Sequence, residues 1–290
     1  MCECALRSIP NEYSYKWHYA MNHAAEIETL VLGNSHAYFG IDTDVFTPLA
    51  LNAANVSQTL EKDDLFLRKH LPSLVKLKRV VITVSYHSLF RRLNTGVEAW
   101  RETYYRIYWH ESGVLPIKYN FEVCSPFPGY RIIKAFTRHR QRPCGKTGMF
   151  SGCKLSRRKD DWRCTGPVAA ERHTVSGNQR VFDDNCRLLK AMVAECMKKK
   201  IKVYILTLPA WSTYTAKLDP EQLRMTVDMC KRSVSSPNCY YYNFLEDSTF
   251  SEADFYDADH LNEFGASKMA KKLADLFDAD LDKARGVTLK

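Results

Sequence analysis

Residues 27–35 read Ile27-Glu-Thr-Leu-Val-Leu-Gly-Asn-Ser35. The first six form a short, mostly apolar run, and a glycine ends it. Such a run is typical of a buried β-strand that leads into a tight turn. We therefore expect a strand over 27–32 and a turn from strand to helix at Ser35, where a hydroxyl would be exposed.

Other segments of the same kind recur along the chain. The segment 79–85 is β-branched and almost continuously apolar, as expected for a strand buried on both faces. The segment 201–208 is stopped by Pro209. The strands predicted after the first one cover 50–56, 79–85, 201–208 and 239–244.

Helical patterns lie between these strands. The stretch 57–71 is one, and residues 188–196 keep one apolar face before a basic end at 198–200. Asp219 and Pro220 have the residue types of a helix cap and first turn, and a last helix is expected around 269–277. Strands alternating with helices predict a three-layer α/β/α sandwich around a mainly parallel sheet.

The 290 residues fit a single domain, 1–290, in which the stretch 91–180 breaks the alternation. We expect that stretch to be an insertion or cap over one end of the sheet, with its helically spaced aromatic residues between Trp100 and Trp109 used for packing. A composition of 45% apolar and 26% charged residues excludes a disordered or fibrous protein. No run approaches eighteen apolar residues, so no transmembrane segment is expected and the chain as given is expected to be soluble.

The net charge of +9 is concentrated in one stretch. Between Arg131 and Arg163, eleven basic residues stand against Asp160 and Asp161, so the rest of the chain is neutral. A solvated loop is the simplest interpretation, and contact with an anionic polymer, lipid headgroups or an acidic partner stays open. No aromatic-interleaved motif accompanies the charge, so no nucleic acid is expected as a partner.

The ten cysteines include no CxxC pair. Cys186, Cys196 and Cys230 fall in helical patterns and are expected to act as small apolar residues. Cys144, Cys153 and Cys164 lie in the basic stretch, where a disulfide or a metal is conceivable. Zinc sites usually bring their ligands in close pairs, so we expect no metal and no cofactor.

Candidate catalytic residues follow from the expected topology, because ligands bind beyond the carboxyl ends of parallel strands. Ser35 comes after the first strand, and Asp257-Ala-Asp-His260 precedes the last helix. A serine nucleophile needs a histidine base, which in turn needs an orienting carboxylate. Asp257 and His260 supply both on one turn. Taken singly, Ser35 is as easily a helix cap and His260 a surface histidine.

The order of these motifs resembles the SGNH (GDSL-like) hydrolase family, in which a serine follows the first strand and Asp-x-x-His precedes the last helix. Gly33-Asn34-Ser35 and Asp257-Ala-Asp-His260 carry the resemblance, which covers roughly 27–90 and 180–282. It implies a flavodoxin-like sheet and the catalytic set Ser35, Asp257 and His260. An α/β-hydrolase fits less well, since its G-x-S-x-G elbow lies deep in the chain and position 37 here is Ala.

The oxyanion-stabilising part of the family pattern differs here. The family uses the N–H of the serine, a glycine N–H in the second block and an asparagine side chain in the third. The second block is Asn52-Ala-Ala-Asn-Val-Ser-Gln58, with no glycine, and the third, 83–87, has no asparagine. We expect Ser35 and Asn55 to form the oxyanion hole, with Tyr86 or His87 as substitutes in the third block.

The sequence thus predicts a serine esterase, or an acyl-transferring relative, that acts on an O-acyl group of a carbohydrate or similar small ester. The alternative is a catalytically impaired glycan-binding or O-acetylation accessory protein with the same fold. A third, weaker reading is an anionic-lipid or nucleic-acid binder working through 131–163. The motifs look most like envelope-associated proteins of Bacteroides-type bacteria, which implies the bacterial cell envelope as the location.

Overall fold

The apolar run that ends at Gly33 forms β1 (Thr29–Leu32), all four residues of which are buried. Leu30 and Leu32 belong to one hydrophobic cluster, whereas Val31 belongs to a second. Successive side chains of a strand point to opposite faces, so β1 is covered on both. The computed structural model describes residues 2–114, 116–126, 128–129, 131–133, 142–150, 152–175 and 177–284.

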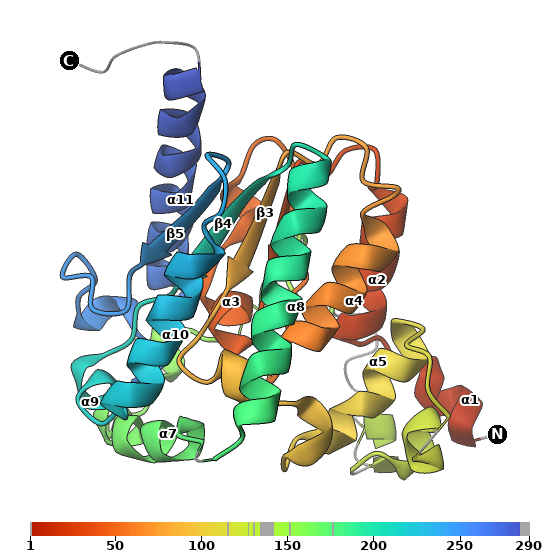
Figure 1. The fold of residues 1–290 in the computed structure, drawn as a ribbon. Coiled ribbons are helices and arrows are strands. Elements are labelled where there is room, and N and C mark those ends of the chain that lie inside the picture. Colours follow the sequence, from red (N-terminus) through yellow and green to blue (C-terminus); the bar gives the residue numbers. More distant parts are fainter. Residues whose placement is uncertain are drawn as a thin grey trace.

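The described strands form one five-stranded sheet in the order β2-β1-β3-β4-β5 (Figure 1). Every pairing is parallel. This is the strand order of flavodoxin-like sheets. The predicted three-layer α/β/α architecture is therefore confirmed. The other strands are β2 (Ala50–Asn52), β3 (Arg79–Thr83), β4 (Lys202–Thr207) and β5 (Cys239–Asn243).

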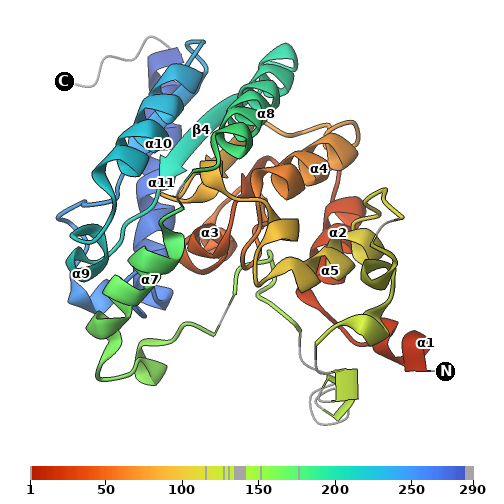
Figure 2. The ribbon, with the colours of Figure 1, turned by 60° about the horizontal axis from the view of Figure 1, so that its bottom comes forward.

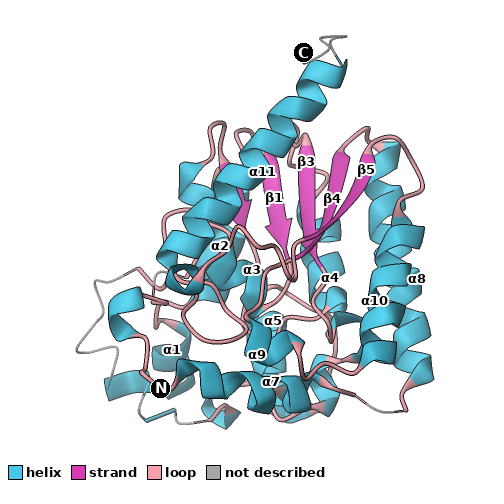
Figure 3. Ribbon diagram, turned by 90° about the vertical axis from the view of Figure 1, so that its left-hand side faces the viewer, coloured by secondary structure: helices cyan, strands magenta, loops and turns pink. Residues whose placement is uncertain are grey.

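Helices cover both faces of the sheet (Figure 3). The larger hydrophobic cluster joins one face to helices that include α4 (Leu60–His70), α8 (Gln179–Lys198) and α10 (Pro220–Ser233). The second cluster joins the other face to α3 (Ser35–Gly40) and α11 (Glu263–Ala284). The helix α2 (Glu12–Asn22) packs beside β2. As the sequence predicts, Asp219 caps α10, accepting a hydrogen bond from the N–H of Gln222 at 2.8 Å.

The second strand is shorter than the predicted 50–56. It ends at Asn52, whose side-chain oxygen accepts a hydrogen bond from the N–H of Ala54 at 3.1 Å. This contact turns the chain out of the ladder, because the side chain takes the place of a strand partner. Asn55 therefore lies in a loop that leads into α4, and not in a strand.

Aromatic residues pack together in the first part of the stretch 91–180. Tyr104, Tyr105 and Tyr108 on α5 (Glu102–Tyr108) are buried, as is Trp109. Tyr13 of α2 lies against three of them, with ring centroids 4.9 Å from Tyr104, 5.1 Å from Tyr105 and 6.3 Å from Trp109. The predicted packing role of these residues is confirmed. The described part of the chain also contains the shorter helices α1 (Cys2–Arg7), α7 (Thr165–His173) and α9 (Ser212–Thr215).

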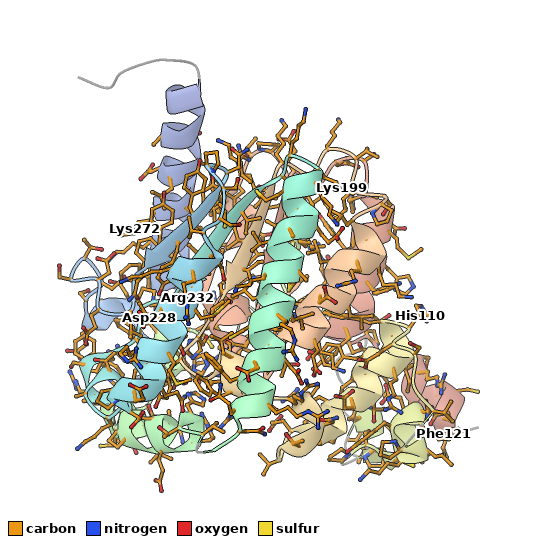
Figure 4. All side chains as sticks on the ribbon, in the orientation of Figure 1. His110, Phe121, Lys199, Asp228, Arg232 and Lys272 are labelled. Atoms are coloured by element: carbon orange, nitrogen blue, oxygen red, sulfur yellow. The ribbon has the colours of Figure 1, made fainter. Side chains whose placement is uncertain are left out.

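A later part of the stretch 91–180 contacts the sheet. The N–H of Asn52 donates to the carbonyl of Thr147 at 2.8 Å, and that of Phe150 donates to the carbonyl of Tyr38 at 2.9 Å. Residues 142–150 thus lie against the end of β2 and against α3. Figure 2 shows this green segment crossing the end of the molecule where α7 and α9 lie. Lys199, just past α8, lies at the opposite end (Figure 4).

Several side chains of the basic stretch are engaged in ion pairs. Arg131 pairs with the buried Glu122, and Arg163 pairs with Glu252 at 2.5 Å. Lys134, Arg138 and Arg140 of the same stretch lie outside the described residues. All ten cysteines are free thiols, of which Cys196 and Cys230 are fully buried. In the part of the chain that the structure describes, no helix has the length and apolarity needed to cross a membrane.

Candidate active site

Ser35 is the first residue of α3, directly beyond the carboxyl end of β1. Asn34 caps the helix by accepting a hydrogen bond from the N–H of His36 at 3.0 Å. Gly33 has φ +141°, and a Cβ at this position would lie 1.8 Å from Thr83 Oγ1. Only glycine fits here, because the turn passes so close to β3. These local constraints hold Ser35 at the edge of the sheet.

The structure brings Ser35, His260 and Asp257 together from opposite ends of the chain. Ser35 Oγ lies 2.9 Å from His260 Nε2, and His260 Nδ1 lies 2.9 Å from Asp257 Oδ1 and 3.1 Å from Oδ2. Asp257 Oδ1 also accepts hydrogen bonds from the backbone N–H groups of Asp259 and His260, at 3.1 and 2.8 Å. The carboxylate is thus oriented by its own turn.

These contacts favour one tautomer of His260. Asp257 accepts hydrogen bonds only, so His260 Nδ1 carries a proton and donates it to the carboxylate. In the neutral ring, Nε2 then has a lone pair that accepts the hydrogen bond from the Ser35 hydroxyl. This is the arrangement in which an imidazole can remove the proton of a serine.

A second carboxylate sets the charge of the histidine. Asp259 Oδ1 lies 3.6 Å from His260 Nδ1, and Asp259 is buried. Burial alone would lower the pKa of His260, but the charges of Asp259 and Asp257 outweigh it and raise the pKa to about 9. Burial alone would raise the pKa of Asp259, and the imidazoles of His260 and His36 beside it lower that pKa instead. The neutral, base-competent form of His260 therefore gains population as the pH rises.

A second serine–histidine–aspartate chain lies behind the first. Ser85 Oγ is 3.1 Å from His36 Nδ1, and His36 Nε2 is 3.6 Å from Asp259 Oδ2. All three residues are buried. Sequence reasoning missed this chain, although His36 and Asp259 are immediate neighbours of predicted site residues. A polar residue next to each predicted catalytic residue was the available signal.

The two proposed substitutes in the third block lie in different surroundings. His87 Nε2 is 3.3 Å from Asn34 Nδ2, and the His87 ring stacks on His173 at 4.1 Å. The hydroxyl of Tyr86 contacts Thr174 and accepts a hydrogen bond from the N–H of Asp219. Tyr86 is thus engaged with the start of α10, whereas His87 adjoins the turn that carries Ser35.

Asn55, the predicted oxyanion donor, is buried in the loop after β2. Its Oδ1 accepts a hydrogen bond from Lys16 Nζ at 2.9 Å, and its Nδ2 donates to Gln58 Oε1 at 2.9 Å. The amide nitrogen carries a second hydrogen beyond the one given to Gln58. The part of Asn55 in an oxyanion hole stays a prediction.

Among the described residues, His36, Asp259 and His260 form a group whose ligand atoms lie within 4.8 Å of one another, as a metal ion would need. A cation bound there would take up a nitrogen of His260. That nitrogen could then no longer serve the contact with Asp257 or Ser35. We therefore treat these residues as parts of the two serine–histidine–aspartate chains.

No family model matches this sequence, and no curated protein is significantly similar to it. Among solved structures, a candidate platelet activating factor from Streptococcus pneumonia is 9% identical over 91% of this chain and 90% of its own, with a TM-score of 0.47. A candidate acylhydrolase from Bacteroides fragilis is 13% identical over 91% and 95%, with a TM-score of 0.46. A GDSL-like lipase from Bacteroides thetaiotaomicron is 14% identical over 92% and 98%, with a TM-score of 0.46.

These identities lie under 25% and the TM-scores under 0.5, so the comparisons carry no conclusion about the family or activity of this chain. At these TM-scores the likeness concerns only the arrangement of helices and strands. Function has to be inferred from the chemistry of the site.

Proposed function

We propose that this chain is a serine ester hydrolase of the SGNH/GDSL type, with Ser35 as nucleophile, His260 as general base and Asp257 as the residue that orients His260. The observation that carries the proposal is the unbroken chain of contacts from Ser35 Oγ to His260 Nε2 and from His260 Nδ1 to Asp257, each at 2.9 Å. A serine, an imidazole and a carboxylate within this reach form the constellation that activates an alcohol for acyl transfer.

In the first half of the reaction, Ser35 Oγ attacks the acyl carbonyl carbon while His260 Nε2 takes the hydroxyl proton. The C–O bond of the ester then breaks, and His260 returns the proton to the leaving alcohol. In the second half, a water molecule gives a proton to His260 as its oxygen attacks the acyl-serine. The carboxylic acid leaves, and Ser35 recovers its proton. An alcohol in place of that water would give acyl transfer.

We assign stabilisation of the tetrahedral oxyanion to the backbone N–H of Ser35 and to Asn55. A donor of this kind contributes about 3 kcal/mol to lowering the barrier, or roughly a hundredfold or more in rate. With no glycine in the second block and no asparagine in the third, this chain has fewer obvious donors than its family pattern. A lower turnover than that of a fully equipped relative follows.

For substrate we propose an O-acyl ester of a carbohydrate, with a cell-envelope carbohydrate as its source. The carbohydrate follows from the sequence resemblance. Next to the site, the ring of the half-buried Phe39 lies 4.9 Å from that of His260, and Phe150 lies 5.0 Å from Phe39. Two partly accessible aromatic rings beside the base provide an apolar wall, which suits a short acyl group or the apolar side of a sugar.

The test is hydrolysis of p-nitrophenyl acetate, together with labelling by a fluorophosphonate, by the wild type and by Ser35→Ala. We expect turnover and labelling in the wild type and neither in the variant. Equal rates of hydrolysis in the two proteins would remove the proposal.

The alternative function is a non-catalytic glycan-binding or O-acetylation accessory protein. The specific observation in its favour is the missing pair of oxyanion donors. It predicts binding of an acylated glycan that survives Ser35→Ala and no labelling at Ser35. Strong fluorophosphonate labelling at Ser35 would dismiss it.

A further inference from the structure

Lys16 on α2 is a fully buried lysine with no carboxylate within ion-pair distance among the described residues. Its relative exposure is 0%, and in the described part of the chain it makes no ion pair. Nζ instead donates to the carbonyl of Ala54 and, at 2.9 Å, to Asn55 Oδ1, and it lies 3.7 Å from the centre of the Tyr38 ring. Burying an ammonium group without an ion-pair partner is unfavourable, so the buried position of Lys16 calls for an explanation.

Lys62 provides a contrast within the same molecule. It is also buried, but its Nζ contacts Glu102 at 2.8 Å and Glu111 at 2.6 Å. Two carboxylates thus offset the charge of Lys62. Lys16 has only carbonyl oxygens and an aromatic face as partners, which are the groups that position an ammonium without neutralising it.

The partners of Lys16 belong to the two segments that matter for the proposed reaction. Tyr38 lies on α3, three residues after Ser35. Ala54 and Asn55 form the loop after β2, which carries the predicted oxyanion donor. One side chain from α2 therefore connects the nucleophile helix to this loop.

The hydrogen bonds continue from Asn55 back to the nucleophile turn. Asn55 Nδ2 donates to Gln58 Oε1 at 2.9 Å, and Gln58 Nε2 donates to Asp63 Oδ1 at 2.6 Å. Asp63 Oδ1 also accepts the N–H of Gly33 at 2.8 Å. A buried polar series thus runs from Lys16 to the residue two positions before Ser35.

We propose that Lys16 is a positioning residue for the proposed hydrolysis: it holds Asn55 in a single amide orientation and fixes the loop after β2 against α3. An asparagine amide can flip and exchange its donor and acceptor ends. Because Lys16 is a donor that occupies Oδ1, the Nδ2 end cannot take that place, and Nδ2 keeps its hydrogen bond to Gln58 and one further hydrogen. This inference rests on the proposed function.

The hydrogen bond from Lys16 also strengthens Asn55 as a donor. In a low-dielectric interior, a bond to the carbonyl end of an amide polarises its N–H groups. Burial lowers the pKa of Lys16 to about 7, so ammonium and neutral amine are both present near neutral pH. Both forms have N–H groups to donate to Asn55 Oδ1, and the ammonium, which has no lone pair, is the form that excludes the flipped amide.

A double-mutant cycle tests the proposal. With p-nitrophenyl acetate, Lys16→Met is expected to lower kcat roughly tenfold to a hundredfold with KM within about twofold, and Asn55→Ala about a hundredfold. If Lys16 acts through Asn55, the double variant is no slower than Asn55→Ala. An unchanged kcat in Lys16→Met, or a double variant as slow as the product of the two single effects, would overturn it.

Lys62→Met is the matched control. It removes a buried lysine of the same size and leaves Glu102 and Glu111 unpaired, so it should lower the melting temperature more than Lys16→Met does. With rates normalised to fluorophosphonate-titrated sites, its kcat should stay near that of the wild type. If both variants lose kcat in proportion to lost stability, Lys16 has a structural role only.

Hydrogen exchange separates failure of this inference from failure of the proposed function. A wild type with no hydrolysis and no labelling of Ser35 refutes the hydrolase, whatever Lys16 does. In that case the positioning itself is read from exchange of the backbone amides in 53–59 and 33–40. Faster exchange of both segments in Lys16→Met than in wild type supports the positioning, and unchanged exchange refutes it.

Discussion

Two serine–histidine–aspartate chains lie next to each other in this molecule, and their histidine rings are 5.2 Å apart. In the first, Ser35 is partly accessible at the start of a helix, and Asp257 binds the far side of His260. In the second, Ser85, His36 and Asp259 are all buried, and the Ser85 hydroxyl also contacts Asn34 Oδ1 at 3.1 Å. The same three residue types thus differ in reactivity between the two chains, because their access to substrate and their neighbouring charges differ.

The charge state of the two histidines shows the difference most clearly. Two carboxylates raise the pKa of His260 to about 9. Burial lowers the pKa of His36, which the nearby Asp259 only partly opposes. His36 therefore remains neutral at neutral pH. A serine cannot react with a substrate that does not reach it, so we assign the first chain to catalysis and the second to support.

Replacing each serine with alanine in turn should give the largest difference in kcat between the two chains. Ser35→Ala is expected to lower kcat for p-nitrophenyl acetate by at least about 10⁴-fold, because the nucleophile is lost. Ser85→Ala should change it by less than about tenfold. Steady-state rates of both folded variants provide the measurement, and a Ser85→Ala variant as slow as Ser35→Ala would show that the chains are not separate in function.

Replacing each of the two aspartates with asparagine in turn should give the next largest difference in kcat. Asp257→Asn removes the acceptor that sets the tautomer of His260 and should lower kcat about 10³- to 10⁴-fold. Asp259→Asn leaves that contact in place and should change kcat by less than about tenfold at its optimum pH. Comparable losses in both variants would show that His260 depends on Asp259 as much as on Asp257.

The pH dependence of kcat/KM should follow the neutral form of His260. The raised pKa means that the base is protonated below about pH 9, so the rate should rise about tenfold per pH unit toward that value and then level off. In Asp259→Asn, which removes one of the charges that raise the pKa, the profile should move to lower pH. A wild-type profile that already levels off near pH 6.5 would contradict the assigned environment.

The free energy of unfolding at acid pH should show whether His36, in the buried second chain, is held neutral. Because the pKa of His36 is lower in the folded than in the unfolded protein, the unfolded state binds more protons below about pH 6.5, and stability falls as the pH decreases. His36→Gln removes this contribution. When the pH is lowered from 6.5 to 5.0, the free energy of unfolding, measured with urea, should decrease less in His36→Gln than in the wild type. The two decreases should differ by up to about 2 kcal/mol. Equal losses would mean that His36 is not held neutral.

The sheet was largely predictable from local patterns. A strand buried on both faces has to be apolar at successive positions, and the runs at 79–85 and 201–208 have that pattern. The end of β2 was not predictable, because it depends on a side-chain hydrogen bond within Asn52–Ala54 that competes with the ladder. The contact of Phe150 with α3 was equally hidden, since it joins segments more than a hundred residues apart.

For the site, the sequence contains the candidate nucleophile in 33–35 and the candidate base and orienting carboxylate in 257–260. Asp257 could be paired with His260 from the sequence alone, because a tight turn places the two within reach of each other. The local sequence does not show how deeply a side chain is buried. Only the packed structure shows that Asp259 is close enough to raise the pKa of His260, that His36 is buried, and that Lys16, which makes no described ion pair, reaches the loop of Asn55. Burial and long-range proximity set these properties, and both arise when distant segments close around one end of the sheet.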